Sequence, residues 1–124
     1  MRSPTTRLVA AAAAAALGLG ALAAAASSAT TTLRLTTPIS CCQFNKKTLI
    51  AQPGTVRITL LNTFPIGHNV AIRKGATVIG RGPIVVGPGK RSVVAATLTR
   101  GTYTFYCSVP GHAAAGMKGV LKVR

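Results

Sequence analysis

The chain has 124 residues and contains neither Asp nor Glu, so no side chain supplies a carboxylate. This absence excludes glycosidases, which need two carboxylates, hydrolases of the Ser-His-Asp type, and calcium or magnesium sites, which consist largely of acidic oxygen ligands. Lys and Arg together number 15 and give a formal charge of +15, which predicts an acidic partner or surface.

Residues 1–29 have the features of a secretory signal peptide. Arg2 and Arg7 precede an apolar, Ala-rich run over residues 8–26, and small Ser and Ala residues close the segment. We therefore expect an exported protein, periplasmic or extracellular, with a single domain over residues 30–124. An uncleaved membrane anchor is the alternative, because about 19 apolar residues can nearly span a bilayer.

From residue 30 onward, β-prone runs alternate with Gly and Pro, and no stretch has a helical period long enough for a convincing helix. The predicted strands are 31–36, 47–51, 55–62, 69–73, 77–80, 91–98, 102–107 and 119–123. In the third run Val56, Ile58 and Leu60 alternate with polar residues, as expected for a strand with one buried and one solvent-exposed face. In the seventh run the same alternation places Cys107 on the packed face and Tyr106 on the wet face. The pattern predicts an all-β domain of two antiparallel sheets, a Greek-key sandwich or barrel.

The segment YCSVPGHAAAGMKG, residues 106–119, holds Cys107, His112 and Met117 at intervals of five in a Gly/Pro-rich loop between two predicted strands. The other histidine, His68, stands in FPIGHNVAI upstream, just before a strand. Two imidazoles and one thiolate, with a weak axial thioether, form the ligand set of electron-transfer copper centres. These four side chains therefore predict one copper ion that alternates between Cu(I) and Cu(II).

The sequence here resembles the cupredoxins, the small type 1 blue copper proteins of the plastocyanin, auracyanin and azurin kind. The resemblance extends over residues 49–123 and rests on the GTVRITLLN strand, the His-Asn pair and the Cys-x4-His-x4-Met loop. It implies that His68, Cys107 and His112 are equatorial copper ligands and that Met117 is the axial one.

The resemblance also implies roles for neighbouring residues. Asn69 would tie the two ligand loops together and hydrogen-bond near the Cys107 sulfur, and Ser108 could bond back toward the same sulfur. Gly67 precedes the first ligand as in the azurin subgroup, where that carbonyl approaches copper axially. Because position 111 is Gly and not Cys, the second thiolate of a dinuclear centre is missing, and we expect a mononuclear site.

The function implied by the resemblance is electron transfer without substrate turnover. In the family the second His reaches the surface within an apolar patch, so we expect electrons to pass through the edge of His112. The positive charge predicts acidic protein redox partners or an anionic membrane surface, and we expect a monomer. A copper carrier or store with the same ligands is the alternative function. Nucleic-acid binding is disfavoured by the predicted export and by the scarcity of aromatic residues, which make up 4% of the chain.

Other metal chemistry is also disfavoured. Thioether is a poor zinc donor, and no acidic side chain is present to act as general base on a zinc-bound water. A multicopper oxidase needs many more histidines than the two in this chain. The adjacent pair Cys41-Cys42 departs from the family pattern; it leaves open a vicinal disulfide, two free thiols or bridges to other molecules, and we assign it no copper.

Overall fold

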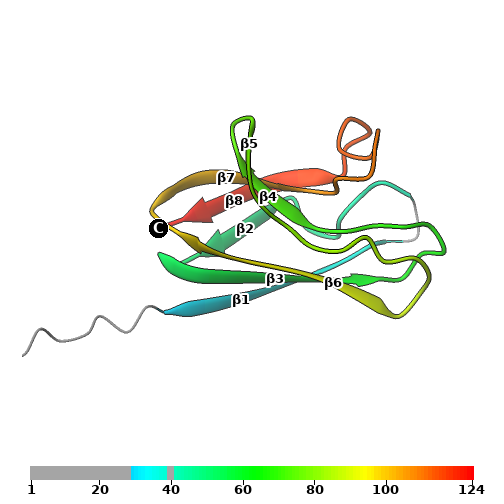
Figure 1. Ribbon diagram of the computed structural model, residues 1–124, viewed down its shortest axis with the longest axis horizontal. Helices are drawn as coiled ribbons and strands as arrows, with labels where there is room; N and C mark the ends of the chain where they lie inside the picture. The colour runs from blue at the N-terminus through cyan, green and yellow to red at the C-terminus, as the bar shows by residue number, and fades with distance from the viewer. Residues whose placement is uncertain (1–28, 39–40) are drawn as a thin grey trace, which may run out of the picture.

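The computed structural model describes residues 29–38 and 41–124, so the predicted signal peptide over residues 1–29 lies outside the described residues except for its last position. The described residues form eight strands, arranged as two stacked sheets (Figure 1). The strands are β1 Thr30–Thr36, β2 Thr48–Ala51, β3 Gly54–Asn62, β4 Ala71–Lys74, β5 Thr77–Arg81, β6 Lys90–Leu98, β7 Gly101–Tyr106 and β8 Lys118–Val123. Within this described part of the chain, no helix has the length and apolarity needed to cross a membrane.

The two sheets contain both antiparallel and parallel pairs. The smaller sheet has the strand order β1-β3-β6 and the larger one β2-β8-β7-β4-β5. The predicted all-β, two-sheet domain is confirmed, but β1 lies parallel to β3 and β2 lies parallel to β8. The chain passes from β1 to β2 in the other sheet before it returns to β3. Such a crossover allows parallel neighbours, whereas a tight hairpin joins only antiparallel ones.

Each predicted run is a strand whose ends differ from the expectation by two residues at most. The largest shift is at β4, which begins at Ala71 and not at residue 69; ahead of it, His68 forms an isolated bridge with Val85. The His68 N–H donates to the Val85 carbonyl at 3.1 Å, and the Val85 N–H donates to the His68 carbonyl at 2.9 Å. Cys107 follows the last residue of β7. His68 and Cys107 therefore both lie just outside a strand, on backbone that the sheets hold in place.

The core lies between the sheets. Val56, Ile58 and Leu60 on β3 are fully buried, as their alternation predicts, and Phe105 and Leu121 of the larger sheet belong to the same cluster. Each such side chain stabilises the fold by about 1.5–3 kcal/mol relative to an exposed one. Much of the stability therefore comes from the contact between the sheets, which also supports the loops that leave them.

The predicted wet position of Tyr106 is wrong, because this residue is 7% exposed. The guanidinium carbon of Arg73, on the neighbouring strand β4, lies 4.9 Å from the centre of the Tyr106 ring. A cation over an aromatic face is favourable, and the aliphatic stem of an arginine covers apolar surface while its head stays polar. Alternation along one strand cannot predict such cover, because it comes from the strand alongside.

Candidate metal centre

The connection between β7 and β8 is a compact loop whose two ends carry sulfur. The Cys107 N–H donates to the Met117 carbonyl at 3.0 Å, which closes the loop at its base. Both side chains are fully buried. Gly116, just before Met117, has a φ of 113°, in the region that favours glycine. The backbone therefore holds the thiol and the thioether at the base of one loop.

His112 lies in the middle of this loop and is turned back toward its base. The His112 N–H donates to the Val109 carbonyl at 3.1 Å, and the Met117 N–H donates to the His112 carbonyl at 3.0 Å. As a result, Nδ1 of the imidazole lies 3.6 Å from Sγ of Cys107. The side chain is half-buried, so one part of the ring faces the thiol while another reaches the surface.

His68 approaches the same point from the other ligand loop. It is fully buried, and its ring centre lies 5.0 Å from that of His112. Candidate ligand atoms of His68, Cys107 and His112 all lie within 4.8 Å of one another. The fold thus brings together three residues that come from two separate loops.

The two ring nitrogens of His68 are buried and have no hydrogen-bond partner among the described residues. Leaving buried polar atoms without a partner is unfavourable. Burial lowers the pKa of His68, and the nearby His112 lowers this pKa further. Both effects favour the neutral ring, the form whose lone pair can bind a metal. An ion at this point would satisfy a nitrogen that the protein leaves unpaired, and the thiol, the imidazoles and the buried thioether nearby are donors that suit copper.

Asn69 joins the two loops. Its Nδ2 donates to Ser108 Oγ at 2.7 Å and to the Gly82 carbonyl at 2.9 Å, while its Oδ1 accepts a hydrogen bond from the Ser108 N–H at 2.7 Å. Within the described residues, neither Asn69 nor Ser108 hydrogen-bonds to the sulfur of Cys107. The hydrogen bonds between Asn69 and Ser108 therefore hold together the two loops that carry His68 and Cys107.

Gly67 stands where the chain has little room for a side chain. A Cβ atom at this position would lie 3.1 Å from a methyl carbon of Ile84 and 3.3 Å from one of Val86. These residues flank Val85, the bridge partner of His68. The glycine therefore permits the close approach of the two segments.

Asn62 is a positioning residue that the sequence reasoning did not identify. It is fully buried at the end of β3. Its Nδ2 donates to the carbonyls of Ile66 at 2.9 Å and Val85 at 3.1 Å, and its Oδ1 accepts from the Phe64 N–H at 3.0 Å. One side chain thus shapes the loop before His68 and holds the segment that bridges to it. The available signal was an Asn that closes an otherwise apolar run.

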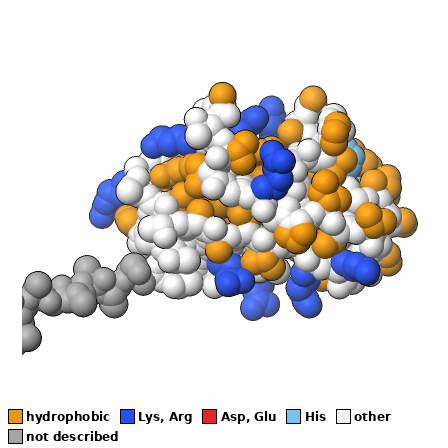
Figure 2. All heavy atoms as spheres, in the orientation of Figure 1, with side chains coloured by type: hydrophobic (Ala, Val, Ile, Leu, Met, Phe, Trp, Pro, Cys, Tyr) orange, Lys and Arg blue, Asp and Glu red, His pale blue; other side chains and the backbone are white. Residues whose placement is uncertain are grey.

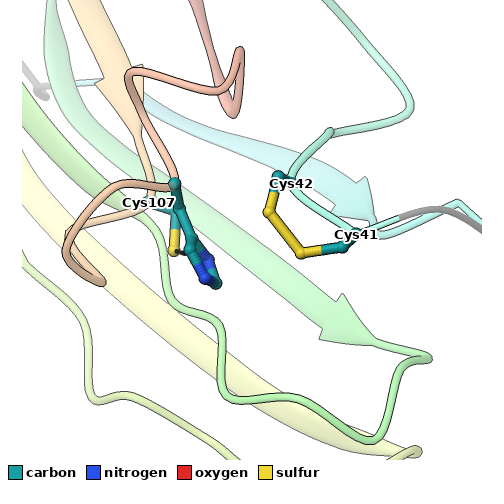
Figure 3. The surroundings of a disulfide bond; sticks show 4 residues. Cys41, Cys42 and Cys107 are labelled. Atoms are coloured by element: carbon teal, nitrogen blue, oxygen red, sulfur yellow. Dashed lines mark hydrogen bonds between the residues drawn. A yellow bond between two sulfur atoms is a disulfide. The ribbon is translucent and has the colours of Figure 1, made fainter.

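Cys41 and Cys42 form a vicinal disulfide, which settles the three alternatives left open by the sequence. Figure 3 shows this disulfide and the Cys107 side chain on separate segments of the chain. Candidate ligand atoms of Cys41, Cys42 and His112 also lie within 4.8 Å of one another. This proximity could not be read from the sequence, because it depends on how β1 and its following loop pack against the β7–β8 loop.

Apolar side chains gather at the surface around this end of the molecule. Ile66, Ile84 and Val86 are 45%, 54% and 63% exposed. Figure 2 shows hydrophobic surface around a small area of imidazole at this end, with Lys and Arg spread over the rest of the visible face. The loop end thus differs in character from the strongly basic remainder.

Comparison with known proteins agrees with this geometry. The model of the family of copper binding proteins of the plastocyanin/azurin type matches residues 31–124. No curated protein matches the sequence.

Solved structures with this fold include blue copper proteins. Reduced auracyanin from Roseiflexus castenholzii is 27% identical with a TM-score of 0.69, over 77% of this chain and 98% of that one. Rusticyanin from Thiobacillus ferrooxidans is also 27% identical, with a TM-score of 0.61 over 77% of each chain. Auracyanin A from Chloroflexus aurantiacus, a "blue" copper protein, is 22% identical with a TM-score of 0.67, over 77% of this chain and 100% of that one, which shows the shared fold alone. This chain belongs to the plastocyanin/azurin family of copper-binding proteins, and copper is its cofactor.

Proposed function

We propose that the protein is a mononuclear type 1 copper electron carrier in which His68, Cys107 and His112 are the equatorial ligands and Met117 is the axial ligand. The observation that carries the proposal is the convergence of candidate atoms from the first three residues within 4.8 Å. The carbonyl of Gly67 is proposed as a further weak axial neighbour. The protein then catalyses no turnover of its own and passes single electrons between partners.

The chemistry of the four proposed ligands, their burial and the support of their backbone all favour electron transfer. Bound copper supplies the one-electron chemistry, because thiolate and thioether suit Cu(I) and imidazole also suits Cu(II). Burial of His68, Cys107 and Met117 excludes water from their side of the site. The bridge from His68 to Val85 and the bond from Cys107 to Met117 hold the backbone on both sides. Ligands fixed in this way rearrange little when the charge of the ion changes, which favours fast transfer.

His112 is proposed as the route by which electrons enter and leave. It is half-buried, unlike His68 and Cys107, and it lies in the apolar end of the molecule. Apolar surface allows a partner to approach closely, while the formal charge of +15 attracts acidic partners over longer distances. We propose that these partners are exported proteins and that the carrier is itself exported and monomeric; an anionic membrane surface is the other acidic target that the charge would attract.

The absorption spectrum with added Cu(II) tests the proposed ligand set. We expect an intense thiolate-to-copper charge-transfer band near the red end of the visible range, as the family resemblance implies. Cys107→Ser should abolish the band, since it removes the thiolate from which the charge is transferred. The Cys41→Ser/Cys42→Ser variant, which lacks the disulfide but keeps all four proposed ligands, should retain it. A colourless protein, or an unchanged band in Cys107→Ser, would overturn the proposal.

The alternative of a copper carrier that hands on its ion predicts fast release. Three of the four proposed ligands are fully buried, and such burial favours retention over release. The rate at which a strong Cu(I) chelator removes copper separates the two functions. An electron carrier keeps its copper through many cycles of reduction and oxidation, whereas a protein that loses it within a few cycles is a copper donor.

A further inference from the structure

The Cys41–Cys42 disulfide has no part in the proposed electron transfer, yet it lies beside the metal centre. Both cysteines are half-buried, and Cys42 packs against the core cluster. Cys42 has a φ of 72°, the left-handed conformation that side chains other than glycine rarely adopt. This conformation costs about 1–3 kcal/mol, and it persists only where the surrounding structure imposes it. The disulfide therefore stands in a backbone segment that is constrained at the edge of the site.

The donors of this pair are within reach of His112. Candidate atoms of Cys41, Cys42 and His112 lie within 4.8 Å of one another, and His112 belongs equally to the group formed with His68 and Cys107. The two groups thus share one imidazole. They differ in burial, because Cys41, Cys42 and His112 are all half-buried whereas His68 and Cys107 are fully buried. The cysteine pair is therefore more accessible to an ion from solvent than His68 and Cys107 are.

The chemistry of the pair once reduced is that of a soft-metal site. Two thiolates and an imidazole suit Cu(I). The chain has no Asp or Glu and a formal charge of +15, so its electrostatic field repels cations. Thiolate is the anionic form of cysteine that binds metals, and the chain has only three cysteines to supply it. Two of those three cysteines lie here, at the more accessible side of the centre.

We propose that reduction of the Cys41–Cys42 disulfide by a dithiol opens a second copper(I) site, formed by both thiolates and His112, from which the ion passes to the buried donors. The transfer step rests on the proposed function, because it requires His112 to be a ligand of the inner centre. Because His112 belongs to both groups, the ion has only a short distance to move when the outer thiolates are exchanged for His68 and Cys107.

The redox step balances with the dithiol as reductant. Its two thiols give two electrons and two protons and close to a disulfide, while the bond between Cys41 and Cys42 breaks to leave two thiols. Binding of Cu(I) then displaces the two thiol protons to solvent. The oxidation state of copper does not change in this step, so no other oxidant or reductant is needed.

The outer site is tested in isolation with the Cys107→Ser chain, which lacks the inner thiolate. The protein is reduced with a phosphine without oxygen, separated from the phosphine, and titrated with Cu(I) against a chromogenic chelator. We expect the reduced protein to bind Cu(I) more tightly than the same protein with the disulfide closed, by about tenfold to a hundredfold or more, since altering groups around a metal already has effects of that size. The matched Cys41→Ser/Cys42→Ser/Cys107→Ser chain should show no effect of the phosphine. Equal affinity of Cys107→Ser in the two redox states would overturn the outer site.

A second measurement compares the reduced and closed forms of the unsubstituted chain, so this comparison does not depend on the folding of a variant. Uptake of Cu(I) from the chelator should be faster with the disulfide reduced than with it closed, and Cys41→Ser/Cys42→Ser should load at the slow rate in either condition. Equal rates for the reduced and closed forms would overturn the transfer step. The Cu(II) charge-transfer band of the disulfide-closed chain is measured in parallel. If the band is present and the redox state has no effect on Cu(I) binding, only this inference fails; if the band is absent, the proposed function fails.

Discussion

Asn69 is the residue whose removal best tests how the two ligand loops are joined. It makes hydrogen bonds to Ser108 Oγ, the Ser108 N–H and the Gly82 carbonyl, and it is fully buried. Asn69→Ala would leave the Ser108 N–H and the Gly82 carbonyl without the partner that Asn69 provides. An unsatisfied buried group costs about 1–3 kcal/mol. We expect a lower free energy of unfolding for the copper-free protein, measured by urea denaturation.

Ser108→Ala is the matched control for this prediction. It removes only the hydroxyl that accepts from Asn69 Nδ2 and keeps both backbone partners of Asn69. A typical hydrogen bond contributes about 0.5–1.5 kcal/mol net, so this variant should lose less stability than Asn69→Ala. Equal losses in the two variants would show that the backbone contacts of Asn69 do not hold the loops.

At the residue scale, the sequence predicted the chemistry of the site better than its surroundings. Cys107, His112 and Met117 could be proposed as ligands because they lie in one loop at regular intervals, and His68 because it is the only other histidine; the structure brings His68, Cys107 and His112 together. The supporting contacts of Asn62 with Ile66 and Val85 join separate segments, and no local pattern encodes them. The same holds for the closeness of the cysteine pair to His112.

At the scale of elements, the strands followed from alternation and turn residues, but their neighbours did not. Alternation along β3 predicted which of its residues are buried. Nothing in a single strand states that β1 and β2 pair in parallel with β3 and β8, because parallel pairing depends on which elements a crossover brings together. Likewise, the alternation of residues did not predict that β4 begins at Ala71, or that His68 pairs with Val85 in an isolated bridge ahead of it.

The β7–β8 loop is the element through which partners are proposed to exchange electrons. Ala114 is exposed, two residues after His112. We expect Ala114→Lys to slow electron self-exchange between two copies of the protein, because a charged side chain must lose water when the apolar ends meet. The measurement is line broadening in NMR spectra of mixed Cu(I) and Cu(II) protein, at high salt to suppress long-range repulsion.

Val78→Lys is the matched control for the loop prediction. Val78 is 45% exposed on β5, outside the ligand loops, so this variant adds the same charge elsewhere. Its self-exchange rate should stay near that of the unsubstituted protein, and both variants should keep the charge-transfer band. If Ala114→Lys and Val78→Lys exchange equally fast, electrons do not pass through the His112 edge.

At the scale of the whole molecule, charge opposes the compact state. Of the 15 Lys and Arg residues, Arg2 and Arg7 lie in the predicted signal peptide and the other 13 lie in the domain. No acidic side chain offsets their charge. Folding brings like charges together, and their repulsion is unfavourable. This repulsion weakens as salt screens the charges. The screening length falls from about 30 Å at 0.01 M salt to about 10 Å at 0.1 M, so repulsion between more distant cations is screened first.

The Tm of the copper-free domain should therefore rise as sodium chloride increases from about 0.01 M to about 0.1 M, where the screening length changes most. The Lys90→Gln/Arg91→Gln variant removes two adjacent exposed charges at the start of β6. Its Tm at low salt should be higher than that of the unsubstituted domain, and its rise with salt should be smaller, because less repulsion is left to screen. Differential scanning calorimetry of both proteins over the salt series gives the two slopes. A flat or falling Tm in the unsubstituted domain, or equal slopes in the two proteins, would mean that repulsion among these cations does not limit its stability.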